Sequence, residues 1–532
     1  MPRESALSPQ DRDFFRLVAQ TAFSNPFSDT RAELDSKIAG VSPTLPHDEL
    51  VWRMVREISK RVQALEDAGH GDVRCYGSED RDMVESAFLF EAFHRFLRSF
   101  DQLIRDQMAQ GDSPAPVPFA NRALAMLARR GFVPEAARIF ATFFQLRRAY
   151  YFTHHGLVGR SPCMKELRAR LWNNVFTHDI RLYGRHLWNR MEDFSTLLLG
   201  ETGTGKGTAA AAIGRSGFIP FDEKKARFTE SFTRSFVAIN LSQYPETLIE
   251  SELFGHVKGA FTGAIDSHEG IFARGSAHGA VLLDEIGEVS ARTQIKLLQV
   301  LQERTFVPVG SHQTLRFRGR VIAATNRPLD QLRSEARFRD DFYYRMCSDV
   351  ITVPPLRQRI REDPAELDAL LDHVLVRIIG APADELLERV RSTLHDTVQR
   401  NYAWPGNVRE LEQAVRRILL TRHYDGDVTA AAPDLQSQLV ADVAAGSTDA
   451  AQLLTNYCAL LYARHGTYEE VARRTNLDRR TVKSYLARSG SAHAPRAAAT
   501  GAPDAAASRA DSPHAARSGA GRPNAATRGQ RR

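Results

Sequence analysis

The sequence of 532 residues lacks closely spaced cysteine pairs, because its four cysteines (Cys75, Cys163, Cys347 and Cys458) lie far apart. Without a CxxC pair we expect reduced thiols rather than disulfides or a structural zinc site. The chain also has no run of about 18 apolar residues and no apolar core near its first residue. These absences predict no membrane partner and no export signal, and therefore a cytoplasmic location.

Large apolar residues are almost missing from residues 491–532, where seven arginines stand against two aspartates. Such a composition predicts a disordered basic tail. The tail accounts for most of the net charge of +7, so the rest of the chain is close to neutral. Overall charge is therefore no argument for nucleic-acid binding. The tail could add phosphate contacts or simply stay solvated.

The rest of the chain shows two patterns of apolar residues, one after the other. Residues 1–155 carry apolar side chains at helical spacing, as in Leu89, Phe93, Phe96 and Phe100, which predicts amphipathic helices. From Thr196 onward short β-rich runs (TLLLG, FVAIN, AVLLDE and RVIAATN) are each followed by turn residues and a helical stretch. Strands that alternate with helices predict a parallel sheet in an α/β fold.

The segment LLLGETGTGKGT fits a phosphate-binding loop, because Gly200 to Lys206 reads GxxxxGK directly after an apolar strand. Glycines let successive backbone N–H groups face phosphate oxygens, and the lysine reaches the β- and γ-phosphates. The strict pattern has Ser or Thr after the lysine, whereas here Gly207 intervenes before Thr208. The predicted nucleotide-binding set in this loop is Gly200, Glu201, Thr202, Gly203, Thr204, Gly205, Lys206, Gly207 and Thr208.

Two further strand ends supply the polar groups that hydrolysis needs. AVLLDEIGE ends in Asp284, which would hold Mg²⁺ through water, and Glu285, which would polarise the attacking water. AATN places Thr325 and Asn326 near the γ-phosphate. The alternative is that the two carboxylates only cap the next helix.

The stretch GHVKGAFTGAIDS, residues 255–267, brackets one phenylalanine with glycines and alanines, which predicts a loop. Phe261 could lie in a buried turn or be exposed to meet a partner.

These motifs resemble, in order and spacing, the AAA+ domain of sigma-54-dependent bacterial transcription activators, over residues 156–425. GAFTGA is a signature of that family. The resemblance implies an exposed loop that contacts sigma-54, in a ring of subunits that hydrolyse ATP with Mg²⁺. The implied sigma-54 contact residues are Gly259, Ala260, Phe261, Thr262, Gly263 and Ala264.

The resemblance implies further roles. Asn240 matches the residue that holds Glu285 away from water, Arg339 and Arg345 match fingers that reach a neighbouring subunit's nucleotide, and Arg409 matches a lid arginine that senses nucleotide. The family usually has Glu where this chain has Gly207. The segment from Gly217 to Ser235 is longer than usual, and we expect it to be a surface insertion, like the long stretch before the P-loop.

Residues 467–490 read as a helix-turn-helix that resembles the Fis-like DNA-binding domain of these activators. Thr467 and Glu470 suggest a capping box for its first helix, and Asp478 a cap for its second. The alternative is a helical hairpin with a solvated basic face. The predicted DNA-binding residues are Arg479, Arg480, Thr481, Lys483, Ser484 and Arg488.

The sequence therefore predicts a multidomain protein with a P-loop α/β core between helical ends. The expected divisions are a helical regulatory domain of unknown type (1–155), the AAA+ α/β subdomain (156–355), its helical lid (356–426), a linker (427–452), the helix-turn-helix (453–490) and the disordered tail (491–532). The predicted function is ATP-driven remodelling of the sigma-54 RNA polymerase holoenzyme from upstream enhancer DNA, by a homo-oligomer that ranges from dimer to hexameric ring. The alternative is a DNA-bound repressor or scaffold that does not remodel sigma-54.

Overall fold

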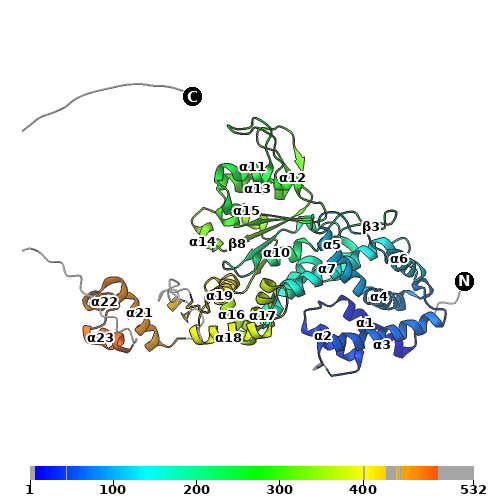
Figure 1. Cartoon of the computed structure of the whole chain (residues 1–532), viewed down its shortest axis with the longest axis horizontal. Coiled ribbons are helices and arrows are strands. Elements are labelled where there is room, and N and C mark those ends of the chain that lie inside the picture. The colour runs from blue at the N-terminus through cyan, green and yellow to red at the C-terminus, as the bar shows by residue number, and fades with distance from the viewer. Residues whose placement is uncertain are drawn as a thin grey trace, which may run out of the picture. The chain divides into compact units, whose positions relative to one another are not determined.

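The computed structural model describes residues 6–42, 45–398, 402–426, 439–440, 442–443, 446 and 448–488. The predicted tail, and most of the predicted linker's first half, lie outside the described residues. The chain divides into two units, Met1–Val428 and Thr429–Arg532, which are described separately (Figure 1). No helix within the described part is long and apolar enough to cross a membrane.

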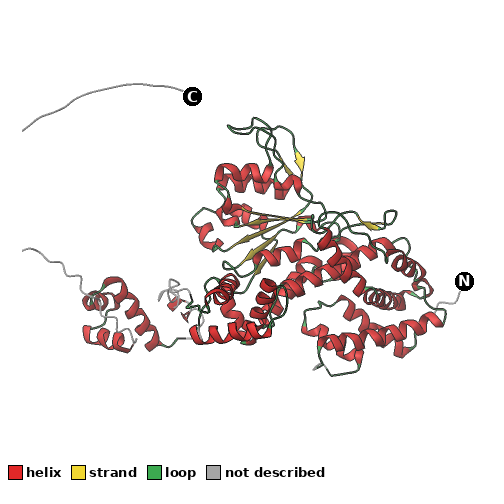
Figure 2. Ribbon diagram, viewed as in Figure 1, coloured by secondary structure: helices red, strands yellow, loops and turns green. Residues whose placement is uncertain are grey.

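The first unit begins with helices, as the apolar spacing predicted (Figure 2). Ser8 caps the first of them by accepting a hydrogen bond from the Asp11 N–H, and Pro9 opens it. The helices of this region are α1 (Pro9–Phe23), α2 (Asp29–Ala39), α3 (His47–Asp67), η1 (Val73–Cys75), α4 (Ser78–Arg95), α5 (Leu97–Gln110), α6 (Ala120–Arg129) and α7 (Ala136–Gly156).

A five-stranded parallel sheet follows, in the order β4-β5-β8-β1-β9. Side chains alternate between its faces. Leu197 and Leu283 point to a cluster with α11, α13 and α15, while Leu198 and Leu282 point to a cluster with α8 and α10. Both faces are therefore covered, as burial of a parallel sheet requires.

The strands of this subdomain are β1 (Thr196–Leu199), β2 (Phe221–Asp222), β3 (Arg227–Phe228), β4 (Phe236–Asn240), β5 (Ala280–Asp284), β6 (Thr305–Phe306), β7 (Leu315–Arg316), β8 (Arg320–Thr325) and β9 (Asp349–Thr352). Its helices are α8 (Pro162–Phe176), α9 (Ile180–Leu182), η2 (Tyr183–Leu187), η3 (Met191–Asp193), α10 (Lys206–Gly214), η4 (Leu241–Gln243), α11 (Glu246–Phe254), α12 (Ile271–Arg274), η5 (Ile286–Glu288), α13 (Ala291–Glu303), α14 (Leu329–Ser334) and α15 (Asp340–Met346).

A helical lid completes the first unit around its own apolar cluster, which includes Leu371, Trp404 and Leu411. Its helices are α16 (Leu356–Glu362), α17 (Ala365–Ile379), α18 (Asp384–Thr397) and α19 (Asn407–Thr421). The second unit contains α21 (Ala450–His465), α22 (Tyr468–Thr475) and α23 (Arg479–Arg488). They pack around Cys458, Leu461, Val471 and Val482.

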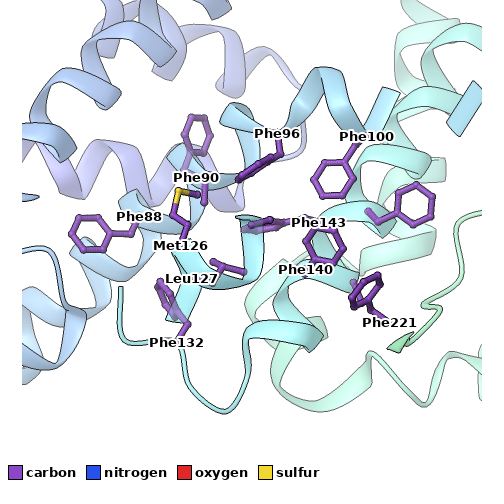
Figure 3. Packing of buried hydrophobic residues seen from close by; sticks show 14 of the residues in the cluster. Phe88, Phe90, Phe96, Phe100, Met126, Leu127, Phe132, Phe140, Phe143 and Phe221 are labelled. Carbon is purple, nitrogen blue, oxygen red and sulfur yellow. The ribbon is translucent and has the colours of Figure 1, made fainter. Parts of the chain in front are cut away.

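One expectation is wrong: residues 217–235 are not a surface insertion. They form the β2–β3 hairpin, and Phe221, Phe228 and Phe232 are buried in the cluster of the N-terminal helices. The Phe221 ring lies 4.9 Å from the Phe140 ring of α7 (Figure 3). The Phe228 ring lies 4.4 Å from that of Phe144. The segment before the P-loop is also partly buried, since Tyr183 is 1% exposed. The aromatic side chains of both segments are removed from water by packing against the surface that includes α7.

Candidate nucleotide site and projecting loop

The P-loop lies at the carboxyl edge of the sheet, between β1 and α10. Gly203 and Gly205 have φ of +81° and +103°, which only glycine adopts without strain. The lid approaches Gly203 so closely that a Cβ there would lie 2.2 Å from the Gly406 carbonyl oxygen. By contrast, a Cβ on Gly205 or Gly207 would meet nothing within 4 Å. The loop is therefore closed toward the lid and open at the first turn of α10.

Lys206 begins α10 and is 7% exposed. Its Nζ donates to the carbonyl oxygens of Gly200 (2.8 Å) and Glu201 (3.1 Å). Burial lowers the pKa of the Lys206 ammonium, while the negative charges of Glu285 and Asp284 act in the opposite direction. The lysine is thus held within its own loop, close to both carboxylates.

Glu285 shows the strain and the missing partner that mark functional positions. Its φ of +57° lies in the left-handed region, and its Oε2 atom is buried without a hydrogen-bond partner. The adjacent Asp284 ends β5, and its Oδ1 accepts the Glu285 N–H at 3.1 Å. A carboxylate held in this way can serve a water or a ligand that enters the site.

The neighbouring strand ends bring the other predicted polar residues to the same edge. Asn240 pairs with Asp284 in register, and its Oδ1 accepts hydrogen bonds from the N–H and hydroxyl of Ser242. Thr325 is fully buried, and its hydroxyl accepts the Arg327 N–H. Asn326 donates to the Thr202 hydroxyl at 2.8 Å, which joins the β8 end to the P-loop.

Two lid residues at this site escaped the sequence prediction. Asn407 is fully buried, and its side-chain amide donates to the Glu201 carboxylate and to the Thr202 carbonyl, both at 3.1 Å. Arg357 forms an ion pair with Glu201 and, by hydrogen bonding, lowers the pKa of that carboxyl. The turn sequence PGN was the available signal, since asparagine tolerates the left-handed region, and Asn407 does adopt a φ of +54°. Arg409 is exposed beside Gly203, where its Cβ lies 3.0 Å from the site of a Cβ on that glycine.

The two predicted finger arginines differ in exposure and in hydrogen-bond partners. Arg339 is exposed, and it forms a two-pronged ion pair with Asp341 at 2.7 and 3.0 Å. Arg345 is half-buried and donates to the Leu301 carbonyl at 3.1 and 2.9 Å. Only Arg339 is presented on the surface of the single chain.

The loop that carries GAFTGA lies between α11 and α12. Its base is a pair of backbone hydrogen bonds between His256 and His268, and its tip is closed by a bond from the Gly259 N–H to the Ala264 carbonyl. Phe261 is 37% exposed and leans on the His256 ring at 4.9 Å. Ile265, which the sequence analysis did not single out, is 75% exposed. The structure thus places two apolar side chains at an open tip, with Ala264 buried beneath them and Thr262 and Gly263 exposed.

Two family models match the part of the chain that carries these residues. Residues 185–352 match the family model of the sigma-54 interaction domain, and residues 361–452 match that of an AAA+ ATPase lid domain. The transcriptional regulatory protein ZraR of Klebsiella oxytoca is 36% identical over 63% of this chain and 69% of its own. The chain belongs to the sigma-54-dependent activator family.

Other members of the family match over a smaller share. The Nif-specific regulatory protein of Azotobacter vinelandii is 39% identical over 53% of this chain and 47% of its own length. The regulator NtrC of Azospirillum brasilense is 38% identical over 49% and 47%. The chain therefore spans about half the length of these curated relatives. The two matching family models cover the AAA+ core of this chain, and that core implies ATPase activity.

The helices of the second unit hold the predicted DNA-binding residues. Asp478 caps α23, as predicted, by accepting the N–H groups of Arg480 and Thr481 at 2.8 and 3.1 Å. The predicted capping box at α22 is wrong: Thr467 makes no side-chain bond there, and Glu470 instead pairs with Arg473 and Arg474. Arg473 and Arg474 lie three and four residues after Glu470 on the same helix, so they bind its carboxylate in place of the helix N-terminus.

The exposed face of α23 carries Arg480, Lys483 and Ser484, with Val482 buried behind it. Arg479 is exposed and pairs with Glu469 at 2.9 Å, while the Thr481 hydroxyl is bonded to Asp478. The side chain of Arg488 lies outside the described residues.

Proposed function

We propose that the protein is a sigma-54-dependent transcriptional activator that binds upstream DNA, assembles into a ring and uses ATP to open promoter complexes of the sigma-54 RNA polymerase. The observation that carries this proposal is the GAFTGA loop. It stands on a double hydrogen-bonded base in a domain that matches the sigma-54 interaction family, and it exposes Phe261 and Ile265. Exposed apolar side chains at a loop tip suit a protein partner.

The site also suits a nucleoside triphosphate. The first turn of α10 leaves N–H groups without intrahelical acceptors, and the open sides of Gly205 and Gly207 give phosphates room to approach them. Lys206 would exchange its two carbonyl partners for phosphate oxygens. Asp284 would hold Mg²⁺ through water, and the orphan Oε2 of Glu285 would accept a hydrogen bond from the attacking water. The metal would neutralise charge on the phosphates.

Assembly would complete the site from a second copy of the chain. A guanidinium fork stabilises charge on a γ-phosphate, which is the role we propose for Arg339 and Arg345 across the subunit boundary. Arg339 would have to leave Asp341, and Arg345 the Leu301 carbonyl. Arg409, beside the P-loop, would report nucleotide state to the lid. We infer a ring, because each finger serves a neighbour.

For α22 and α23 we propose a Fis-like helix-turn-helix. Asn476, with φ of +53°, makes the left-handed turn between the helices. Arg480 and Lys483 lie three residues apart on the exposed face of α23 and could reach a groove together. Two copies would add their half-site specificities.

The test is open-complex formation on a sigma-54 promoter with ATP. Phe261→Ala should remove open complexes and leave ATPase activity, because the loop tip lies away from the P-loop. Lys206→Ala should abolish nucleotide binding, whereas Glu285→Ala should bind ATP and hydrolyse it very slowly. Leu420→Ala, at an 85% exposed apolar position on the lid, is the control and should change nothing. DNA binding and ATPase activity without open complexes in the unmodified protein would instead support the repressor or scaffold.

A further inference from the structure

Several segments of the chain meet at His256, the residue at the base of the GAFTGA loop. Its backbone N–H and carbonyl oxygen pair with His268, on the returning side of the loop, at 3.0 and 2.9 Å. On its other side, the backbone of Gly255 and Val257 pairs with Val309, in the segment between β6 and β7, at 2.8 and 3.1 Å. The backbone at His256 is therefore held between two neighbouring stretches, like a central strand.

The imidazole of His256 adds two hydrogen bonds at the same place. Nε2 lies 3.0 Å from the Asp266 carbonyl oxygen, on the returning side, and Nδ1 lies 2.7 Å from the hydroxyl of the buried Ser251 in α11. Because a carbonyl oxygen can only accept, Nε2 carries the proton, and in the neutral ring Nδ1 then accepts from the hydroxyl. The ring therefore joins the end of α11 to the returning side of the loop.

The same ring also supports the tip of the loop. The Phe261 ring meets the His256 ring edge to face, with the two centroids 4.9 Å apart. Edge-to-face pairs at this distance are stabilising beyond the apolar area that they bury. Phe261 remains 37% exposed, so the contact covers part of the ring and leaves the rest free for a partner.

Helix α11 connects this junction to the nucleotide edge of the sheet. Strand β4 ends at Asn240, which pairs in register with Asp284, and α11 follows after η4. The end of α11 approaches the loop a second time, because Glu252 Oε2 lies 3.6 Å from His268 Nε2. A displacement of α11 would therefore act on both sides of the loop.

We propose that His256 is a positioning residue for the partner contact: it fixes the direction of Phe261 and connects that ring to α11. The inference rests on the proposed function, in which Phe261 contacts sigma-54. Without the imidazole, the tip would lose its ring contact and the link to Asp266. A more flexible tip loses more conformational freedom on binding, so the contact would be weaker. Within the described residues, the imidazole bonds only to α11 and the loop, so ATP hydrolysis should not depend on it.

The first experiment measures the hold on Phe261 without any partner. Chymotrypsin cleaves after phenylalanine, and cleavage of a folded protein follows the population of locally opened chain. Mass spectrometry of the full chain reports cleavage between Phe261 and Thr262. His256→Ala should raise this rate at least about tenfold, the effect of losing one to two hydrogen bonds. His395→Ala, on exposed α18, is the control and should not change it. Equal rates in His256→Ala and the unmodified chain would overturn the proposal.

Two further substitutions separate the hydrogen bonds from the ring contact, in proteins whose unfolding temperatures are compared first. His256→Gln keeps a side-chain N–H that can reach the Asp266 carbonyl oxygen, so cleavage should stay close to the unmodified rate. His256→Phe keeps a ring but forms neither hydrogen bond, so it should be cleaved about as fast as His256→Ala. If His256→Gln were cleaved as fast as His256→Phe, the hydrogen bonds would not be what holds the loop.

The second experiment measures the effect on the partner. On a sigma-54 promoter with ATP, His256→Ala should need at least about tenfold more sigma-54 RNA polymerase for half-maximal open-complex formation, at an unchanged ATPase rate. An unchanged requirement would overturn the positioning role, and a parallel loss of ATPase activity would show a general structural role instead. If the unmodified chain opened no promoter, the proposed function would fail, while the cleavage rates would still decide whether His256 holds Phe261.

Discussion

Helical regions occupy both ends of the described chain, and they relate to the ATPase core in different ways. The C-terminal helices α21 to α23 have a small apolar cluster of their own and fall in a separate unit. The N-terminal helices share one cluster with Phe221, Phe228 and Phe232, which belong to the chain after the P-loop helix. The C-terminal helices therefore form a separate module, whereas the N-terminal helices are part of the core.

Helix α7 makes the connection. Arg148 is fully buried, and its guanidinium donates to the carbonyl oxygens of Arg215 (2.6 Å) and Gly217 (2.7 Å). Gln145 donates to the Ser216 carbonyl at 2.9 Å. Three successive carbonyls beyond the end of α10 are therefore satisfied by α7. Helix ends leave such carbonyls unpaired, so α7 acts as a C-terminal cap for the P-loop helix. Helical content alone therefore does not make a region separable.

The largest expected effect comes from deleting each end. Removal of residues 1–156 should give a protein that aggregates and binds no nucleotide, because it exposes three phenylalanines and uncaps α10. Removal of residues 429–532 should leave nucleotide binding unchanged. Fluorescent ATP-analogue binding and size-exclusion chromatography measure both. A soluble fragment 157–428 that binds nucleotide would show that the N-terminal helices are not part of the core.

A single core substitution is the next test. Phe228→Ala should lower the free energy of unfolding of the first unit by about 3–5 kcal/mol, the usual loss for a buried phenylalanine. The ATPase and the N-terminal helices should unfold together in urea. Val482→Ala, in the C-terminal cluster, serves as the control and should leave that transition in place. Separate transitions for the N-terminal helices and the sheet would show two independent domains.

The cap itself can be weakened without a cavity. Arg148→Lys should cost about 1–3 kcal/mol, because an ammonium cannot satisfy both carbonyls with the geometry of the fork. Arg389→Lys, in an exposed pair with Glu385, should cost less than about 0.5 kcal/mol. Urea unfolding measures both. Equal effects would mean that α7 does not hold α10 through Arg148.

The smallest effect concerns pH. Burial lowers the pKa of His94 from 6.5 to about 3, with Arg31 and Arg147 adding to the shift. Below pH 6.5 the His94 imidazole binds a proton in the unfolded chain but not in the folded chain. Its contribution to the free energy of unfolding is therefore complete above pH 6.5 and is lost as the pH drops toward 3. We expect a loss of about 1–2 kcal/mol between pH 7 and pH 5 that His94→Asn abolishes. His395→Asn, on exposed α18, is the control. An unchanged pH slope in His94→Asn would show that His94 is solvated.

Much of the candidate site could be predicted because it lies in short, contiguous motifs. The P-loop, the Asp284–Glu285 pair and Asn326 each follow a strand, and parallel strands bring their ends to one edge. Asn407 and Arg357 were missed because they reach Glu201 from the lid, more than 150 positions along the chain. The lack of a hydrogen-bond partner for the Glu285 Oε2 also depends on the packing around it, which no local sequence pattern predicts.

The order of elements, the nucleotide loop and the GAFTGA loop follow from local sequence, since glycine positions and apolar periodicity act over a few residues. Burial of the phenylalanines of residues 217–235 and capping of the P-loop helix by α7 depend instead on tertiary packing. Each of these needs surfaces from distant segments to meet. Burial of apolar area is non-directional, so the sequence shows that a phenylalanine needs cover but not which helix provides it.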